Sequence, residues 1–128
     1  MIVVTLPFPP STNNLFVNTS RGRIRSSRYD VWATEAAWEL TRQKPAKAAG
    51  AVSLKFEFGL PDNRKRDLSN LLKAPEDLLV KFGIIQADDT SVVRGFSASI
   101  NDSIKGVRIT ITPAGEDNGS RTQQQRSA

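Results

Sequence analysis

The residues best able to do chemistry lie between positions 61 and 93. Asp67, Asn70, Lys73 and Asp77 recur every three or four residues. If Asp67 opens a helix, this spacing places an acid, an amide, an amine and a second acid on one helical face. Three basic residues precede Asp67 and would bring phosphates towards it. The spacing therefore predicts a charged site built on one helix.

An Asp88-Asp89 pair stands ahead of the next apolar segment. It would converge with Asp67 if that segment is a strand packed beside the helix. Mg²⁺ prefers hard oxygen ligands, commonly one or two carboxylates together with waters and substrate oxygens. A lysine beside such an ion stabilises charge that develops on a phosphate. The set is therefore suited to the hydrolysis of phosphodiester bonds.

Each of these features also has an ordinary structural explanation. An Asp at a helix start is commonly a cap, and Asp-Asp before a strand is commonly a turn. A basic run is commonly a solvated loop. The pattern alone leaves both interpretations open.

Composition narrows the classes of protein that remain. At 128 residues the chain is the size of one domain. It has no Cys and no His, which excludes disulfides, thiol nucleophiles and zinc sites built on those residues. Its 18 Lys and Arg against 13 Asp and Glu give a net charge of +5, which favours a polyanionic partner. No apolar run reaches the roughly 18 to 20 residues of a membrane span, and no basic region precedes the N-terminal apolar stretch. We therefore expect no membrane insertion, no secretion and a cytoplasmic location.

Hydrophobic patterning predicts an α+β (α/β) domain: a mixed sheet with two main helices in the order β-α-β-α-β-β. The first helix begins at Ser26-Ser27 and ends before Pro45, and the second is kinked or broken at Pro75 and stops at Gly83. The last two strands are expected to form a hairpin near Asn101. The domain covers residues 1–114, and residues 115–128 form a disordered polar tail. The expected strands are 2–6, 51–60, 92–100 and 107–112, the expected helices start at 26 and 68, and residues 11–28 form a basic loop or short hairpin.

Four sequence markers occur in a fixed order. They are residues 6–14, residues 61–73, residues 76–79 and residues 83–93, which read LPFPPSTNN, PDNRKRDLSNLLK, EDLL and GIIQADDTSVV. Together they resemble the RusA family of Holliday junction resolvases, which are small homodimeric Mg²⁺-dependent endonucleases often carried by phages and prophages. The resemblance spans nearly the whole predicted domain. It implies a RusA-like fold and a homodimer that resolves branched DNA by symmetric paired nicks during recombination and repair.

The resemblance also implies roles for individual residues. Asp67, Lys73 and Asp89 take the catalytic positions, and Asp67, Asp89 and Asp88 are the implied metal ligands. Ser69, Asn70 and Asp77 are possible auxiliary residues. The candidates for contact with DNA phosphates are Arg21, Arg23, Arg25, Arg28, Arg64, Lys65 and Arg66, and Asn13 and Asn14 are expected to support the loop near the site.

Ser69 departs from the family motif, which has a second aspartate at this position. A hydroxyl is a weaker Mg²⁺ ligand than a carboxylate. The favoured hypothesis is an active endonuclease that works with Asp67, Asp89 and either Asp77 or Asp88. Two alternatives remain: a junction-binding protein with weakened or no cleavage, and a basic scaffold protein of phage origin.

Overall fold

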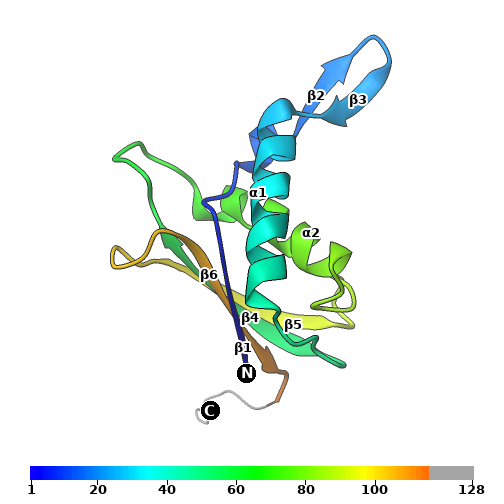
Figure 1. Cartoon of the computed structure of the whole chain (residues 1–128), viewed down its shortest axis with the longest axis vertical. Coiled ribbons are helices and arrows are strands. Elements are labelled where there is room, and N and C mark those ends of the chain that lie inside the picture. The colour runs from blue at the N-terminus through cyan, green and yellow to red at the C-terminus, as the bar shows by residue number, and fades with distance from the viewer. Residues whose placement is uncertain (116–128) are drawn as a thin grey trace.

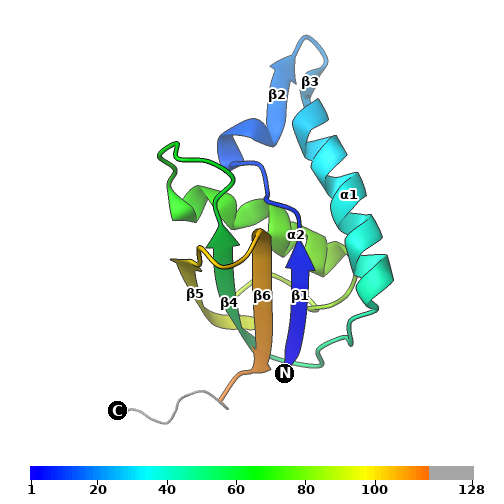
Figure 2. The ribbon, with the colours of Figure 1, turned by 60° about the vertical axis from the view of Figure 1, so that its left-hand side comes forward.

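The computed structural model describes residues 1–115; the rest of the predicted polar tail lies outside the described residues. Four strands form a mixed sheet in the order β1-β6-β4-β5 (Figures 1 and 2). They are β1 (Ile2–Leu6), β4 (Val52–Gly59), β5 (Val93–Ile100) and β6 (Gly106–Pro113). β4 is parallel to β5 and antiparallel to β6, and β1 is antiparallel to β6. The predicted α+β class with a mixed sheet is therefore confirmed.

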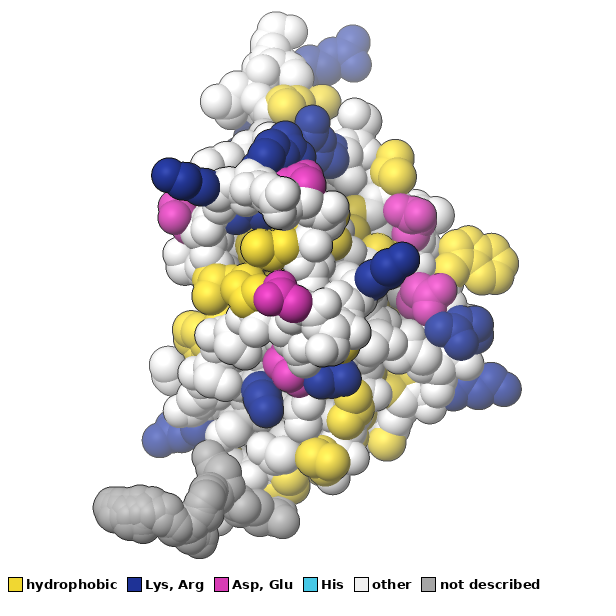
Figure 3. Space-filling model, turned by 90° about the vertical axis from the view of Figure 1, so that its left-hand side faces the viewer, with side chains coloured by type: hydrophobic (Ala, Val, Ile, Leu, Met, Phe, Trp, Pro, Cys, Tyr) yellow, Lys and Arg dark blue, Asp and Glu magenta, His cyan; other side chains and the backbone are white. Residues whose placement is uncertain are grey.

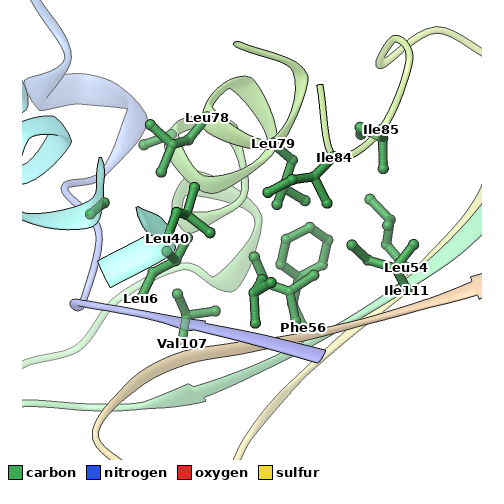
Figure 4. Close-up of a cluster of buried hydrophobic side chains, with 14 of the residues drawn as sticks. Leu6, Leu40, Leu54, Phe56, Leu78, Leu79, Ile84, Ile85, Val107 and Ile111 are labelled. Carbon is green, nitrogen blue, oxygen red and sulfur yellow. The ribbon is translucent and has the colours of Figure 1, made fainter. Parts of the chain in front are cut away.

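Both helices lie over one face of this sheet, α1 (Ser27–Gln43) beside α2 (Lys73–Lys81). Alternate residues of β4 are buried against them, which is the period of a strand with one covered face. Figure 4 shows the contact, with Phe56 of β4 below Leu79 and Ile84. Trp32 of α1 joins the same core, and its indole Nε1 donates a hydrogen bond of 2.9 Å to the carbonyl of Pro7. This buried core supports the elements that carry the candidate site.

The limits of α1 agree with the sequence prediction. The hydroxyl of Ser26 caps the helix by accepting a hydrogen bond of 3.0 Å from the backbone N–H of Tyr29. Lys44 ends it in the left-handed conformation, with φ 51°, and Pro45 follows, where a helix cannot easily continue.

Residues 68–82 form two helical segments, so the break expected because of Pro75 is present, but it lies at Leu72 rather than at the proline. A 3₁₀ helix, η2 (Leu68–Leu71), comes first, and α2 begins only at Lys73. Pro75 sits in the first turn of α2, where its missing N–H costs no hydrogen bond. The expected shared face for Asp67, Asn70, Lys73 and Asp77 is therefore wrong, and only Lys73 and Asp77 share a helix. Gly83, with φ 72°, does end this segment as predicted.

The predicted hairpin between the last two strands is also wrong. β4 lies between β5 and β6 and pairs with both. The turn near Asn101 instead carries the chain past the end of β4, where a Cβ on Gly59 would lie 1.8 Å from the carbonyl oxygen of Ile104. The missing side chain at Gly59 permits this crossing.

A second, two-stranded sheet forms a hairpin that projects from the body (Figures 1 and 2). Its strands are β2 (Phe16–Thr19) and β3 (Gly22–Arg25), they follow the short 3₁₀ helix η1 (Thr12–Asn14), and all their residues are exposed. This confirms the hairpin expected within residues 11–28. Among residues 1–115, no helix combines the length and apolar character needed to cross a membrane.

Candidate active site

Lys73 is the centre of a charged cluster. Its Nζ lies 3.1 Å from Asp77 Oδ1, one turn along α2, and 3.7 Å from Asp88 Oδ2. Glu76 adds further negative charge nearby. The hydrogen bond to Asp77, together with the charges of Asp77, Asp88 and Glu76, raises the pKa of Lys73. The ammonium is therefore held in its charged form.

Asp88 reaches this cluster from the segment between α2 and β5. Ile84 and Ile85 are buried just before it and anchor the segment against the core. Asp89 is engaged differently, because its Oδ1 accepts hydrogen bonds from the backbone N–H of Ser91 at 2.9 Å and from the Ser91 hydroxyl. These bonds lower the pKa of Asp89. The structure thus places Asp88 rather than Asp89 against Lys73, and the catalytic role implied for Asp89 stays a prediction.

Asp67 lies outside this ion-paired cluster. It is exposed and occupies the cap position of η2, where its backbone carbonyl accepts a hydrogen bond of 3.0 Å from Asn70 N–H. Its side chain makes no capping hydrogen bond, so the ordinary explanation of this aspartate as a side-chain cap is not supported. The Thr12 hydroxyl donates to the Asn70 carbonyl at 3.1 Å, which ties the N-terminal loop to η2.

The two asparagines predicted to support this loop behave differently. Asn14 Nδ2 donates to the Ser11 hydroxyl at 3.1 Å, and the Asn14 carbonyl accepts a hydrogen bond from the Ser26 hydroxyl. Asn14 therefore links the loop to the start of α1. Asn13 is exposed within η1, and its predicted support role stays a prediction.

The carboxylates near Lys73 provide the smallest number of protein ligands that a magnesium site usually has. Within residues 1–115, no three acidic side chains come together as a ready metal cluster. Asp77 and Asp88 nevertheless both reach one ammonium group, which gives two hard oxygen donors around the position of Lys73 Nζ. One or two carboxylates completed by waters and substrate oxygens are a usual protein environment for Mg²⁺. The donor set therefore fits this ion, although Asp67 and Asp89 do not join it directly.

Four of the predicted DNA contacts line one groove of about 560 Å³, namely Arg28, Arg64, Lys65 and Arg66. The groove runs between the N-terminal loop, α1 and the segment that leads to Asp67. Figure 3 shows several Lys and Arg side chains in the upper part of one face, with others spread along its edge and lower part. A groove with this charge and size is suited to a phosphate backbone.

Arg66 differs from Arg64 and Lys65 because its guanidinium contacts both the Asp62 carboxylate and the Phe8 ring. Its two terminal nitrogens bind the two oxygens of Asp62 at 2.8 and 3.1 Å, and its guanidinium lies 5.3 Å from the centre of the Phe8 ring. Arg66 and the backbone N–H of Arg64 together lower the pKa of Asp62 well below its usual range. Arg66 therefore holds the segment before Asp67 in its conformation by binding Asp62. Arg64 and Lys65 are exposed.

The three arginines of the hairpin also differ in the contacts that their side chains make. Arg25 forms an ion pair with Asp30 at 3.0 Å and lies over the ring of Tyr29, whereas Arg23 lies over Phe16 at 4.6 Å. Arg21 is exposed in the turn between the strands.

The sequence patterns did not indicate the contacts made by Asp62, Phe16 and Glu76. The spacing of Asp62 four residues before Arg66 was visible, but nothing in the sequence indicated that the intervening loop would fold back.

Comparisons with known proteins agree on one family. The family model described as "Endodeoxyribonuclease RusA" matches residues 7–112. A crossover junction endodeoxyribonuclease RusA of Aquifex aeolicus is 32% identical over 110 residues, which cover 84% of this chain and 86% of that protein. Proteins of the same name from Escherichia coli strain K12 and Enterobacteria phage 82 are each 36% identical over 92 residues, covering 70% of this chain and 75% of theirs.

Proposed function

Because the chain belongs to the RusA family of endodeoxyribonucleases, which hydrolyse phosphodiester bonds of DNA, we propose that it resolves four-way DNA junctions by paired nicks. The relatives carry the name crossover junction endodeoxyribonuclease. The observation that supports the proposal most strongly is the ion-paired group of Lys73, Asp77 and Asp88. Of its three members, the family resemblance implied a catalytic role for Lys73, a metal ligand in Asp88 and a possible auxiliary residue in Asp77.

We also propose that phosphodiester hydrolysis at this site depends on Mg²⁺. Asp88 and Asp77 would hold the ion, and the resemblance implies Asp67 and Asp89 as further carboxylate ligands. When bound, the ion supplies Lewis-acid activation of water and of the scissile phosphate. Lys73 donates to the phosphate oxygens as negative charge grows on them, which stabilises the transition state.

The basic groove positions the substrate for this chemistry. Arg28, Arg64 and Lys65, which line one groove, bind phosphates of the junction. The hydrogen bonds between Asp62 and Arg66 hold the segment that carries Asp67. Two copies of the chain, related by a two-fold axis, would match the two-fold symmetry of a junction and present two active sites. We therefore propose that the chain acts on junctions as a homodimer.

A labelled four-way junction incubated with the purified protein tests the function. We expect symmetric paired nicks with Mg²⁺, no nicks in EDTA, and no cleavage of the matching linear duplex. Nicking that is equal on linear and branched DNA would contradict junction selectivity, and nicking in EDTA would contradict the role of the metal.

Ser69 supports one alternative function. The residue lines the pocket beside Lys73 and brings a hydroxyl where the family motif has a carboxylate, so a junction-binding protein with little cleavage is the second candidate. It predicts tight, salt-sensitive binding with no products at any Mg²⁺ concentration. Recovery of cleavage in Ser69→Asp would favour this alternative over the active enzyme.

A further inference from the structure

A pocket of about 340 Å³ opens directly beside Lys73, between the β2–β3 hairpin and the η2–α2 segment. Lys73 and Arg23 supply two cations to its wall, and Phe16 supplies an aromatic ring. The remaining lining residues are the apolar Leu15 and Leu72, the hydroxyl-bearing Thr12 and Ser69, and the acidic Glu76. The pocket thus combines cations, a ring, apolar contacts and polar groups in one small volume.

Strand pairing explains why the hairpin turns this particular face towards Lys73. Asn18 pairs with Arg23, and Val17 pairs with Ile24. Because side chains alternate along a strand, Phe16, Asn18 and Arg23 share one face, and Val17 and Ile24 share the other. Phe16 and Arg23 both line the pocket. The polar and aromatic face of the hairpin is therefore the one that meets the active site.

The ring of Phe16 is held in place. Arg23 lies 4.6 Å from its centroid, and the Tyr29 ring meets it edge-on with centroids 6.0 Å apart. Tyr29 is in turn held by the guanidinium of Arg25 at 4.4 Å. These ring and guanidinium contacts connect the wall opposite Lys73 to the start of α1.

We propose that this pocket receives one nucleotide of the cleaved strand, next to the scissile phosphate. This inference rests on the proposed function and adds to it a site for the base. Arg23 and Lys73 bind the phosphate on the two sides of the nucleotide, and the base lies against Phe16 and the apolar wall. Stacking of a base on an aromatic side chain is a general device for holding an unpaired nucleotide. Ser69, Thr12 and Glu76 face the edge of the base, so the pocket makes cleavage depend on local sequence.

Fluorescence of 2-aminopurine tests this placement without requiring cleavage. The base is introduced, one position at a time, near the point of strand exchange of a junction, and the protein is added in EDTA. We expect the fluorescence to rise at one position, because a base that leaves its stack regains emission. Phe16→Ala should change that signal, and Val17→Ala, on the opposite face of the same strand, should leave it as in the unmodified protein.

A cleavage assay on junctions with randomised bases around the exchange point provides the second readout. We expect Phe16→Ala to weaken the discrimination among bases by about fivefold or more, from the loss of one stacking contact, while Val17→Ala keeps the original preference. Identical fluorescence and preference in the two variants, with junctions still bound and nicked, would overturn the nucleotide pocket and leave the proposed function standing. Failure of the unmodified protein to bind junctions at all would instead overturn the proposed function. A phosphate-only pocket would show sensitivity to Arg23→Ala but none to Phe16→Ala, which also contradicts the proposal.

Discussion

Lys73 and Asp88 are distant in the sequence, yet the lysine Nζ lies 3.7 Å from Asp88 Oδ2. The contact joins the first residue of α2 to the segment that leads into β5. It exists because Ile84 and Ile85 return the chain to the core directly after the helix. The same ammonium also binds Asp77 at 3.1 Å, so one cation organises two carboxylates.

Replacing Lys73 by methionine should reduce junction nicking by about 10²- to 10³-fold, a usual loss when one donor to a developing charge is removed. The basic groove remains, so the Kd for the junction should change little. Single-turnover nicking and gel-shift titrations measure the two effects. Lys81→Met, at the other end of the same helix, is the matched control and should nick at the normal rate. Equal rates for both variants would exclude Lys73 from the chemistry.

Ser69→Asp should lower the Mg²⁺ concentration needed for half-maximal nicking, because it adds a carboxylate to the proposed metal site. A titration of nicking rate against Mg²⁺ measures the change. Ser69→Ala serves as the comparison and should need at least as much Mg²⁺ as the unmodified protein. An unchanged requirement in Ser69→Asp would show that residue 69 does not face the ion.

The bond between Asp62 and Arg66 should make stability depend on pH. The pKa of Asp62 is lowered, chiefly by the hydrogen bonds from Arg66, so the ionised carboxylate stabilises the folded chain above the ordinary aspartate pKa of about 4. That contribution is lost as the pH falls below this value towards the folded-state pKa. Asp62→Asn should therefore be less stable than the unmodified protein at pH 7, and the difference should shrink in acid.

Urea unfolding at pH 7 and near pH 3 measures this difference. The exposed turn residue Asp102 provides a control, because Asp102→Asn removes a carboxylate that forms no ion pair among the described residues. A gap between Asp62→Asn and the unmodified protein that stays constant with pH would show that the ion pair does not supply the stability.

Gly106→Ala should destabilise the fold by more than about 1 kcal/mol. Gly106 has φ 80°, and a Cβ there would lie 2.2 Å from the carbonyl oxygen of Leu6. Gly95→Ala, where a Cβ meets nothing within 4 Å, is the control and should stay close to the original stability. Thermal unfolding of both variants tests the comparison. Equal melting temperatures would contradict the close approach of β1 and β6 at this point.

The sequence predicted the parts of the fold that depend on local signals. The serine cap and the proline limit of α1, the alternation along β4 and the glycine after α2 all act within a few residues. The position of β4 between β5 and β6 could not be predicted in this way, because strand order is decided by packing between segments far apart in the chain. Helical spacing likewise misplaced Asp67, since a switch from 3₁₀ to α geometry at Leu72 changes the direction of every following side chain.

The candidate site was only partly predictable for the same reason. Motif spacing selected Lys73 and the Asp88-Asp89 pair, but it could not decide which aspartate faces the lysine. That choice depends on the hydrogen bonds that Asp89 makes with Ser91. The contribution of Phe16 depends on the hairpin and the η2–α2 segment lining one pocket, which no local pattern contains.

The nicking rate of Asp88→Asn on a bound four-way junction is the most direct measure of whether the group around Lys73 is the catalytic centre. The change keeps the shape of the side chain and removes the charge that faces Lys73, so we predict that cleavage is abolished at saturating Mg²⁺ while the Kd for the junction stays within a few-fold of the original. Asp102→Asn, measured beside it, should nick normally. Normal nicking by Asp88→Asn would contradict the assignment of the group around Lys73 as the catalytic centre.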